Sequence, residues 1–343
     1  MKRHELGAAG LTDPRLARAY QACADRLRGR NPAAFPTTRC LLPPGKRPYY
    51  DALLAFCRHT DDLLDDPTVE VAERERRFDA FAAYLTGLME AAPDGTAPPY
   101  VPSPSPSPGD GEEPPGALIA VAFAHFTRVW RIPAESVSRF LRTIRGDLRV
   151  TAYPTYQDLH AYMRDVSGEP AVWINTLLQP AAPAEHSRRM VVALSHGIYL
   201  LHFIGDIGED LRLGRVYLPQ EDLGRYGVTR SALATAASTG RPSEPVRLLI
   251  RHQAVRVHQL LAASDGWWRL LHPASRQFAH RYHALARDAL HDLVRGGYEV
   301  PRPASPALAT GRAALATART GAAYAHGLLR PLWAPPAAVT RLT

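Results

Sequence analysis

Two short acidic segments with the same spacing constrain this chain more than any other feature of its sequence. Asp61 and Asp65 are four residues apart, and so are Asp206 and Asp210. Side chains four positions apart share one face of a helix, so each pair predicts two carboxylates one turn apart. Apolar residues precede both pairs, and carboxylates that continue a buried stripe are costly unless they bind something. We therefore interpret the two segments as parts of two helices that hold a shared ligand.

Magnesium is the cation that suits such a pair of acidic turns. It takes few carboxylates and keeps the rest of its octahedron for water and phosphate oxygens. The expected site is a magnesium-bridged diphosphate site between two helices. The predicted metal ligands are Asp61, Asp62, Asp65, Asp206 and Asp210. The structural alternative is a solvated helix face, where aspartates are common.

Hydrophobic periodicity predicts an all-α protein. Segments with a period of 3.6 residues dominate, and strict alternation is almost absent. We expect helices over residues 12–30, 48–66, 69–92, 116–131, 133–150, 158–178, 185–213, 229–239, 245–263 and 268–296. Pro170 predicts a kink in one of them.

A segment rich in Pro, Ser and Gly, residues 93–115, interrupts this helical pattern. Such a segment cannot bury apolar surface and predicts an exposed loop. Because the acidic segments on either side need each other, we expect an insertion within one domain of residues 1–300. Residues 301–343 change to Ala, Pro, Arg and Thr, which predicts a tail with at most a loose helix over 306–325.

Charge and cysteine content limit the partners and the compartment. The net charge is +8, but acids and alanines interrupt the basic clusters, so nucleic acid is not an expected partner. Anionic substrates, or at most peripheral association with a membrane, fit better. The three cysteines match neither a disulfide framework nor a zinc motif. With no signal-peptide pattern and no apolar run of membrane-spanning length, we expect a cytoplasmic protein with reduced thiols.

Several motifs between residues 33 and 300 carry a family resemblance. They are Leu41 to Arg47 (LLPPGKR), Ala55 to Asp66 (AFCRHTDDLLDD), Ile144 to Asp147 (IRGD), Tyr153 to Tyr162 (YPTYQDLHAY), Gly205 to Pro219 (GDIGEDLRLGRVYLP) and Arg295 to Val300 (RGGYEV). In this order they resemble the squalene/phytoene synthase family. The resemblance implies the all-α isoprenoid synthase fold, a single bundle around a deep apolar channel with an allylic diphosphate at its mouth.

The same resemblance implies roles for residues around the acidic segments. The aspartates of the two pairs would hold magnesium that bridges to the diphosphate, and they would be essential for catalysis. Arg58 would contact the diphosphate, since a guanidinium group suits phosphate oxygens. Tyr162 would line the pocket near the reacting carbons, and Arg215 and Tyr217 would close the site. The alternatives are an ion pair of Arg58 with Asp62, a core position for Tyr162, and loop structure for the last two.

The implied chemistry is ionisation of a prenyl diphosphate. Magnesium and arginine stabilise the leaving diphosphate, so the C–O bond ionises to an allylic cation. An apolar, aromatic-lined channel keeps water away and stabilises the cation with π-faces. A nucleophile held nearby then attacks the cation.

The chain departs from the family pattern at the second acidic segment. The family's Q-L-x-N-x-x-R-D reads YLLHFIGD here, so Tyr199 stands for the glutamine, His202 for the asparagine and Gly205 for the arginine. Tyr199 and His202 are still expected to lie at the substrate. For His202, ligation of the metal and a neutral hydrogen-bonding role are both open.

A second departure lies where the family reads V-A-G-x-V-G and this chain reads VSGEPA, Val166 to Ala171. Glu169, Pro170 and Trp173 would alter the wall that holds a second prenyl chain. Glu169 is also a candidate catalytic residue and Trp173 a candidate substrate contact, because a carboxylate among aromatic side chains can orient an acceptor that carries an N–H group.

The leading hypothesis from the sequence is therefore a magnesium-dependent prenyltransferase. It would ionise an allylic diphosphate, with farnesyl diphosphate favoured, and transfer the chain to an aromatic acceptor such as the indole of a tryptophan-containing cyclic dipeptide. The first alternative is head-to-head condensation of two prenyl diphosphates to squalene, phytoene or a presqualene-type product. Cyclisation or hydrolysis of one prenyl diphosphate, and a non-catalytic binding subunit, are further alternatives.

Overall fold

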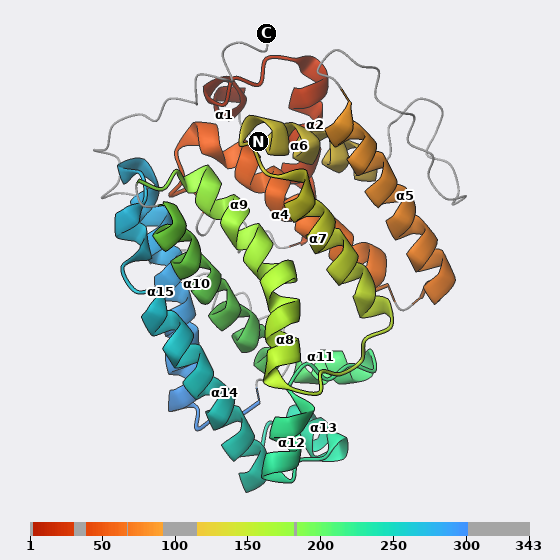
Figure 1. The fold of residues 1–343 in the computed structure, drawn as a ribbon, viewed down its shortest axis with the longest axis vertical. Helices are drawn as coiled ribbons and strands as arrows, with labels where there is room; N and C mark the ends of the chain where they lie inside the picture. Colours follow the sequence, from red (N-terminus) through yellow and green to blue (C-terminus); the bar gives the residue numbers. More distant parts are fainter. Residues whose placement is uncertain (1–2, 31–38, 67, 92–114, 182–183, 301–343) are drawn as a thin grey trace. The chain divides into compact units, whose positions relative to one another are not determined.

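The computed structural model describes residues 3–30, 39–66, 68–91, 115–181 and 184–300 (Figure 1). Helices make up nearly all of their regular structure. Within these ranges there is no β-strand, and extended pairing is limited to isolated bridges, such as the parallel one between Ala152 and Val216. The all-α prediction is confirmed. The tail over 301–343, with its loose helix, and nearly all of the predicted 93–115 loop lie outside the described residues.

The chain divides into two compact units, the first ending its main part at Leu148 and the second beginning at Arg149. The prediction of one domain stays a prediction. The helices of the first unit are α1 (Arg3–Ala8), α2 (Pro14–Arg30), η1 (Pro44–Lys46), α4 (Arg47–Leu64), α5 (Val71–Glu90), α6 (Pro115–Val129), α7 (Ala134–Arg145) and η2 (Gly146–Leu148).

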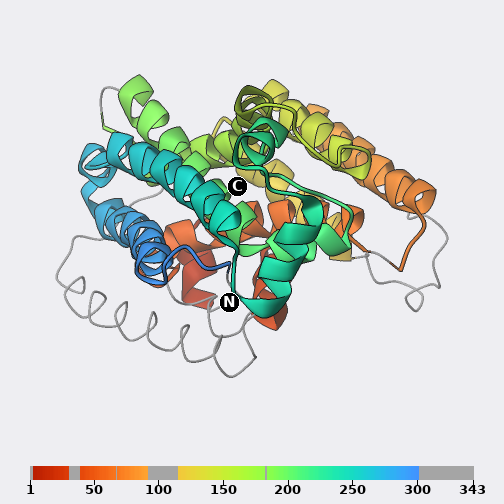
Figure 2. The same cartoon turned by 90° about the horizontal axis from the view of Figure 1, so that it is seen from below.

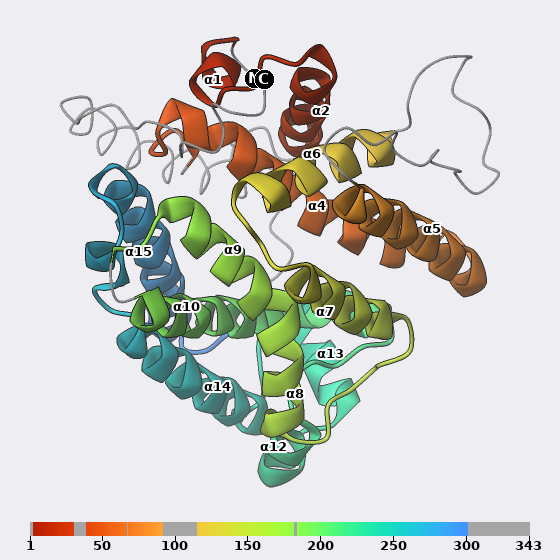
Figure 3. The same ribbon diagram turned by 45° about the horizontal axis from the view of Figure 1, so that its top comes forward.

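Helix α4 is the centre of the first unit and packs against α2, α5, α6 and α7 (Figure 3). Phe56 on α4 is fully buried and touches one ring from each of three neighbouring helices. It stacks on Phe123 with centroids 3.7 Å apart, and its centroid is 6.2 Å from that of Phe81 and 5.4 Å from that of Phe140. This aromatic core fixes the helix that leads into the first acidic segment.

Helix α1 was not predicted, because ion pairs rather than a periodic pattern hold it. Glu5 is only 2% exposed and receives hydrogen bonds from Arg39 at 3.0 and 2.9 Å and from Arg47 at 3.0 Å. Arg39 also donates to Asp51 on α4. A six-residue helix is marginal by itself, so these tertiary contacts supply its stability.

The second unit contains α8 (Tyr156–Met163), the π-helical turn η3 (Arg164–Gly168), α9 (Glu169–Leu178), α10 (Ala184–Gly205), α11 (Ile207–Arg212), α12 (Gln220–Tyr226), α13 (Arg230–Thr239), α14 (Glu244–Ala263), η4 (Trp267–Leu270) and α15 (Pro273–Arg295). Helix α10 packs against α9, α14 and η3, and α14 lies beside α15 (Figure 2). A Cβ atom on Gly197 would lie 3.1 Å from the Cδ2 atom of Leu261, so glycine permits the close approach of α10 to α14.

Three predicted helices are wrong in their extent. The predicted 185–213 helix ends at Gly205, and α11 begins only after Asp206; Gly205 and Gly208 lie on either side of this aspartate, and glycine is a poor helix former. The predicted 268–296 helix is a 3₁₀ turn followed by α15, because Pro273 holds the preceding residue out of the helical region. The predicted 133–150 helix ends at Arg145 and continues as a 3₁₀ turn.

The predicted 158–178 helix is interrupted by η3, immediately before the expected kink at Pro170. Helix α12 was not predicted.

Cys23, Cys40 and Cys57 are free, and burial raises the pKa of each thiol, which favours inert, structural cysteines. No helix in the described part of the chain has the length and apolarity that a membrane span needs.

Candidate functional site

The first acidic segment is the last turn of α4. The backbone N–H of Asp65 donates to the carbonyl of Asp61 at 3.0 Å, so the expected one-turn spacing of the two carboxylates is present. Arg58 lies one turn earlier, with its Nη1 atom 4.0 Å from the Asp61 carboxylate. The side chains of Arg58 and Asp61 are 57% and 41% exposed, so this charged turn is open to a ligand.

Asp62 has a different surrounding from its neighbours. Its carboxylate accepts a hydrogen bond from Arg26 on α2 at 2.6 Å, and its side chain is 24% exposed. The ion pair of Arg58 is with Asp61, at 4.0 Å, and not with Asp62 as the structural alternative assumed. The role of Asp62 as a metal ligand stays a prediction.

The second acidic segment is a break between two helices. Asp206 lies at φ −99° and ψ 8°, directly before α11, and the N–H of Asp210 donates to its carbonyl at 2.9 Å. Gly214 adopts a φ of +83°, a conformation that side chains disfavour, and turns the chain back. The N–H of Arg215 then donates to the carbonyl of Asp210 at 2.7 Å. One local backbone path therefore returns the buried Arg215 to Asp210, one turn after Asp206.

Backbone pairing places the following segment against the chain that leads into α8. The N–H of Val216 donates to the carbonyl of Thr151 at 2.8 Å, and the N–H of Gln220 donates to that of Tyr153 at 2.9 Å. These bonds fix the register of the two segments. As a result, Tyr153 and Tyr217 lie side by side.

Four aromatic rings form a cluster beside the second acidic segment. Tyr217 stacks on Phe203 with a centroid distance of 4.5 Å, and Tyr162 and Tyr153 lie 5.9 and 6.0 Å from Tyr217. Tyr162 and Tyr217 were predicted from the sequence, whereas Tyr153 and Phe203 were missed. Phe203 lies three residues before Asp206, a helical spacing toward the same face that could have identified it.

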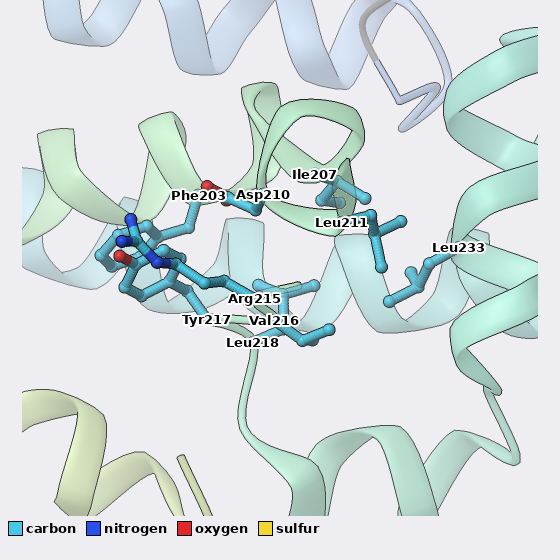
Figure 4. A pocket seen from close by; sticks show the side chains of 9 residues that line it. All are labelled: Phe203, Ile207, Asp210, Leu211, Arg215, Val216, Tyr217, Leu218 and Leu233. Atoms are coloured by element: carbon cyan, nitrogen blue, oxygen red, sulfur yellow. The ribbon is translucent and has the colours of Figure 1, made fainter. Parts of the chain in front are cut away.

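A small cavity is lined in part by Phe203 and Tyr217 of this cluster (Figure 4). Its volume is about 10 Å³, enough for about one water molecule and too small for a prenyl chain. It is lined by Phe203, Ile207, Asp210, Leu211, Arg215, Val216, Tyr217, Leu218 and Leu233. Asp210 and Arg215 thus line the same cavity, and most of the other side chains that line it are apolar.

The remaining predicted residues lie on α9 and α10. Glu169 begins α9 and is 6% exposed, and Trp173, one turn later, is fully buried. Tyr199 on α10 directs its hydroxyl to the carbonyl of Val166 in the π-helical turn, at 3.4 Å. The ring centroid of the exposed His202 is 6.0 Å from that of Tyr199. Contact of these four side chains with a substrate stays a prediction.

The donor chemistry of both acidic turns fits magnesium. Each offers carboxylate oxygens one helical turn apart, and magnesium accepts one or two carboxylates together with phosphate oxygens and water. Within the described ranges, no group of three or more His, Cys, Asp or Glu side chains forms a metal site by itself.

Comparison with known proteins gives matches over most of the chain. A family model described as squalene/phytoene synthase matches residues 30–316. A phytoene synthase from Arthrospira platensis is 24% identical over 274 residues, which cover 76% of this chain and 79% of that protein. A 15-cis-phytoene synthase from Synechococcus elongatus is 23% identical over 299 residues, which cover 84% and 87%.

Solved structures share the fold. A squalene synthase from Alicyclobacillus acidocaldarius has a TM-score of 0.68 at 22% identity and covers 86% of this chain and 99% of its own. A dehydrosqualene synthase in complex with a ligand has a TM-score of 0.66 at 18% identity and covers 90% and 96%. The isoprenoid synthase fold expected from the motifs is confirmed.

Proposed function

The chain belongs to the squalene/phytoene synthase family, and we propose that it condenses two molecules of an allylic prenyl diphosphate head to head. Members of this family are prenyltransferases that act on prenyl diphosphates and in general depend on a divalent metal. The observation that carries the proposal is the family match over residues 30–316. It favours this reaction, the first alternative of the sequence analysis, over transfer to an aromatic acceptor.

In the proposed mechanism the aspartates of the two acidic turns, Asp61, Asp65, Asp206 and Asp210, hold Mg²⁺. The bound ion supplies positive charge that stabilises the diphosphate leaving group. The guanidinium groups of Arg58 and Arg215 add donors that match phosphate oxygens. These residues therefore favour departure of the diphosphate over its return.

The aromatic cluster serves the carbon side of the reaction. Tyr153, Tyr162, Phe203 and Tyr217 form one cluster of rings, and two of them, Phe203 and Tyr217, line a cavity together with Asp210 and Arg215. We place the allylic cation beside this cluster. Ring faces stabilise a desolvated cation by about 2 kcal/mol. Their bulk also keeps water from capturing it.

The nucleophile is the double bond of the second prenyl diphosphate. Its electron pair forms a carbon–carbon bond to the cation, and loss of one proton closes a cyclopropane ring. One diphosphate and one proton leave for each pair of substrate molecules. The product of this step is a cyclopropyl diphosphate of the presqualene type.

A second candidate, transfer to an aromatic acceptor, rests on one observation. Glu169 is a carboxylate at a buried position, 6% exposed, with the buried Trp173 one turn along the same helix. A buried carboxylate of this kind can accept a hydrogen bond from the N–H of an indole. The product assay described next distinguishes this candidate from head-to-head condensation.

The test is a product assay with magnesium and labelled farnesyl or geranylgeranyl diphosphate, each alone and with an indole-containing cyclic dipeptide. A cyclopropyl diphosphate, or a C30 or C40 hydrocarbon, formed without the dipeptide is the expected result. A prenylated indole formed only with the dipeptide would replace it with the second candidate. Prenyl alcohol or a cyclic terpene as the sole product contradicts both.

Variants connect the product to the acidic turns. Asp61→Ala and Asp206→Ala should each lower turnover at least about 100-fold while the helical circular dichroism is unchanged. Asp25→Ala is the matched control, since Asp25 is an aspartate on α2 whose side chain is 52% exposed. Full activity in either of the first two variants would remove the metal assignment.

A further inference from the structure

Pro170 removes a backbone hydrogen-bond donor from the segment that joins α8 to α9. In an α-helix, the carbonyl of Val166 would accept a hydrogen bond from the N–H of residue 170, four positions later. Proline has no N–H. In the structure the Tyr199 hydroxyl donates to this carbonyl instead, at 3.4 Å. A side chain of α10 therefore supplies this carbonyl with a donor that residue 170 cannot supply.

The affected carbonyl belongs to the π-helical turn η3, and α10 contacts this turn at a second point. The Ser195 hydroxyl donates to the carbonyl of Ser167 at 3.0 Å. Ser195 and Tyr199 are one helical turn apart on α10, so together they brace consecutive carbonyls. The four residues from Asp165 to Gly168 are buried, where an unpaired carbonyl is costly. The hydroxyl groups of α10 thus stabilise a turn type that is rare in proteins overall but frequent at functional sites.

The residue that lacks the N–H and the residue that supplies the hydroxyl are both points where the chain departs from its family's pattern. The family motif has valine, which carries an N–H, where this chain has Pro170, and glutamine where it has Tyr199. Proline creates the need for an external donor, and tyrosine meets it. The Tyr199 hydroxyl therefore serves a carbonyl that Pro170 leaves without its α-helical donor, although the two residues are 29 positions apart in the sequence.

The turn also sets the direction of the next side chains. Glu169 follows it directly, and Trp173 lies one turn further on the same face of α9; both are buried. We propose that Pro170 and Tyr199 are a matched pair of positioning residues that hold the π-helical turn, and with it Glu169 and Trp173, in the orientation that selects the second substrate. The selection of that substrate, a second prenyl diphosphate, rests on the proposed function; the pairing of the two residues does not.

A double-mutant cycle tests the pairing without any substrate. The variants are Tyr199→Phe, Pro170→Ala and the combination, with Pro170→Val as a second form of the donor-restoring change. Tyr199→Phe should raise the unfolding equilibrium constant about tenfold when Pro170 is present, because the Val166 carbonyl loses its donor. With Pro170→Ala in place, the N–H of residue 170 serves this carbonyl, and Tyr199→Phe should change the constant less than about twofold.

Tyr226→Phe is the matched control for the cycle, since it removes a phenol hydroxyl on α12, outside α8, α9 and α10. Its effect should be the same with and without Pro170→Ala. An equal effect of Tyr199→Phe in both backgrounds, with alanine and with valine, would overturn the matched pair.

The selectivity is read from products. With labelled farnesyl and geranylgeranyl diphosphate, Tyr199→Phe should shift ionised substrate at least about threefold from condensation product to prenyl alcohol, with a KM for the first substrate within about twofold. The double variant should return toward the original partition. An unchanged partition overturns the positioning role. No condensation by the unaltered protein overturns the proposed function, and the unfolding cycle then still decides the pairing.

Discussion

Tyr217 lies face to face with Phe203, with ring centroids 4.5 Å apart and ring planes inclined by 7°. Phe203 is three residues before Asp206 on α10, and Tyr217 is two residues after Arg215. The stack therefore joins the residues that precede the acidic segment to the residues that follow it. A stacked pair contributes about 1 kcal/mol beyond the area that it buries.

Substitution at Tyr217 separates the ring from the hydroxyl. Tyr217→Phe keeps the π-face and should leave kcat within about threefold, whereas Tyr217→Leu should lower kcat at least about tenfold, since ring faces stabilise a desolvated cation by about 2 kcal/mol. Steady-state kinetics with the labelled prenyl diphosphate measures both. Tyr226→Leu on α12 is the control. Equal losses in the two Tyr217 variants would assign the role to the hydroxyl.

Asp222 is a buried carboxylate that joins α12 to α14. It is 2% exposed and accepts hydrogen bonds from Arg256 and, at 2.9 Å, from Gln253. The Arg256 guanidinium lies 4.0 Å above the ring of Tyr156 at the start of α8. The carboxylate thus holds together three helices around the segment that carries the aromatic cluster.

Asp222→Ala should therefore lower the free energy of unfolding by about 3 kcal/mol, because it leaves a largely buried guanidinium group unpaired. Urea unfolding followed by circular dichroism measures the loss. Glu244→Ala is the matched control on α14: its ion pair with Arg247 spans 3.3 Å, but the Glu244 side chain is 70% exposed. That change should cost less than about 0.5 kcal/mol. Similar losses in both variants would contradict the network.

The sequence predicts the parts of this fold that depend on local patterns. The spacing of Asp61 and Asp65 is a helical repeat, and their helix ends within two residues of its expected end. The break at Asp206 was missed because apolar periodicity continues through it and masks the signal of Gly205. The return of Arg215 toward Asp210 depends on the left-handed turn at Gly214, which periodicity does not report.

The aromatic cluster was not predicted as a unit, for a similar reason: Tyr162 and Tyr217 were separate site candidates from the sequence. Tyr153 reaches Tyr217 through backbone pairing between segments more than sixty residues apart in the sequence, and no local pattern encodes such a register. Helix α1 depends on ion pairs of Glu5 with distant arginines. Motif resemblance supplied the chemistry that periodicity cannot.

Buried histidines predict how stability depends on pH. Burial lowers the pKa of both His125 and His196 from 6.5 to about 4. Both are neutral in the folded protein at pH 6, whereas the unfolded chain binds protons there. The stabilisation is therefore complete above pH 6.5 and is lost as the pH falls toward 4, by about 1 kcal/mol per pH unit for each residue.

His196→Leu tests this dependence. It should remove about 1 kcal/mol per pH unit from the slope of unfolding free energy between pH 6.5 and 4. Urea midpoints at pH 7, 6 and 5 give the slope. His258→Leu, at an exposed position of α14, should leave it unchanged. If the slope is the same in the His196 variant, the pKa of this histidine does not differ between the folded and unfolded states.

Gly214 offers a test of the turn that returns Arg215 to the acidic segment. A Cβ atom at this glycine would meet no atom within 4 Å, so Gly214→Ala is a change of backbone preference alone. At a φ of +83°, alanine should cost about 1–2 kcal/mol. Because Arg215 follows directly, kcat/KM for the prenyl diphosphate should fall about tenfold as the guanidinium group shifts.

The matched control has the opposite expected sign. Gly224 on α12 also has no atom within 4 Å of an added Cβ, but its backbone is helical. Gly224→Ala should therefore raise the free energy of unfolding by up to about 1 kcal/mol and leave kcat/KM unchanged. Urea unfolding and initial rates on the two variants decide the point. If both alanines stabilise the protein, the left-handed turn at Gly214 does not hold Arg215 in place, and the arginine reaches the acidic segment by another path.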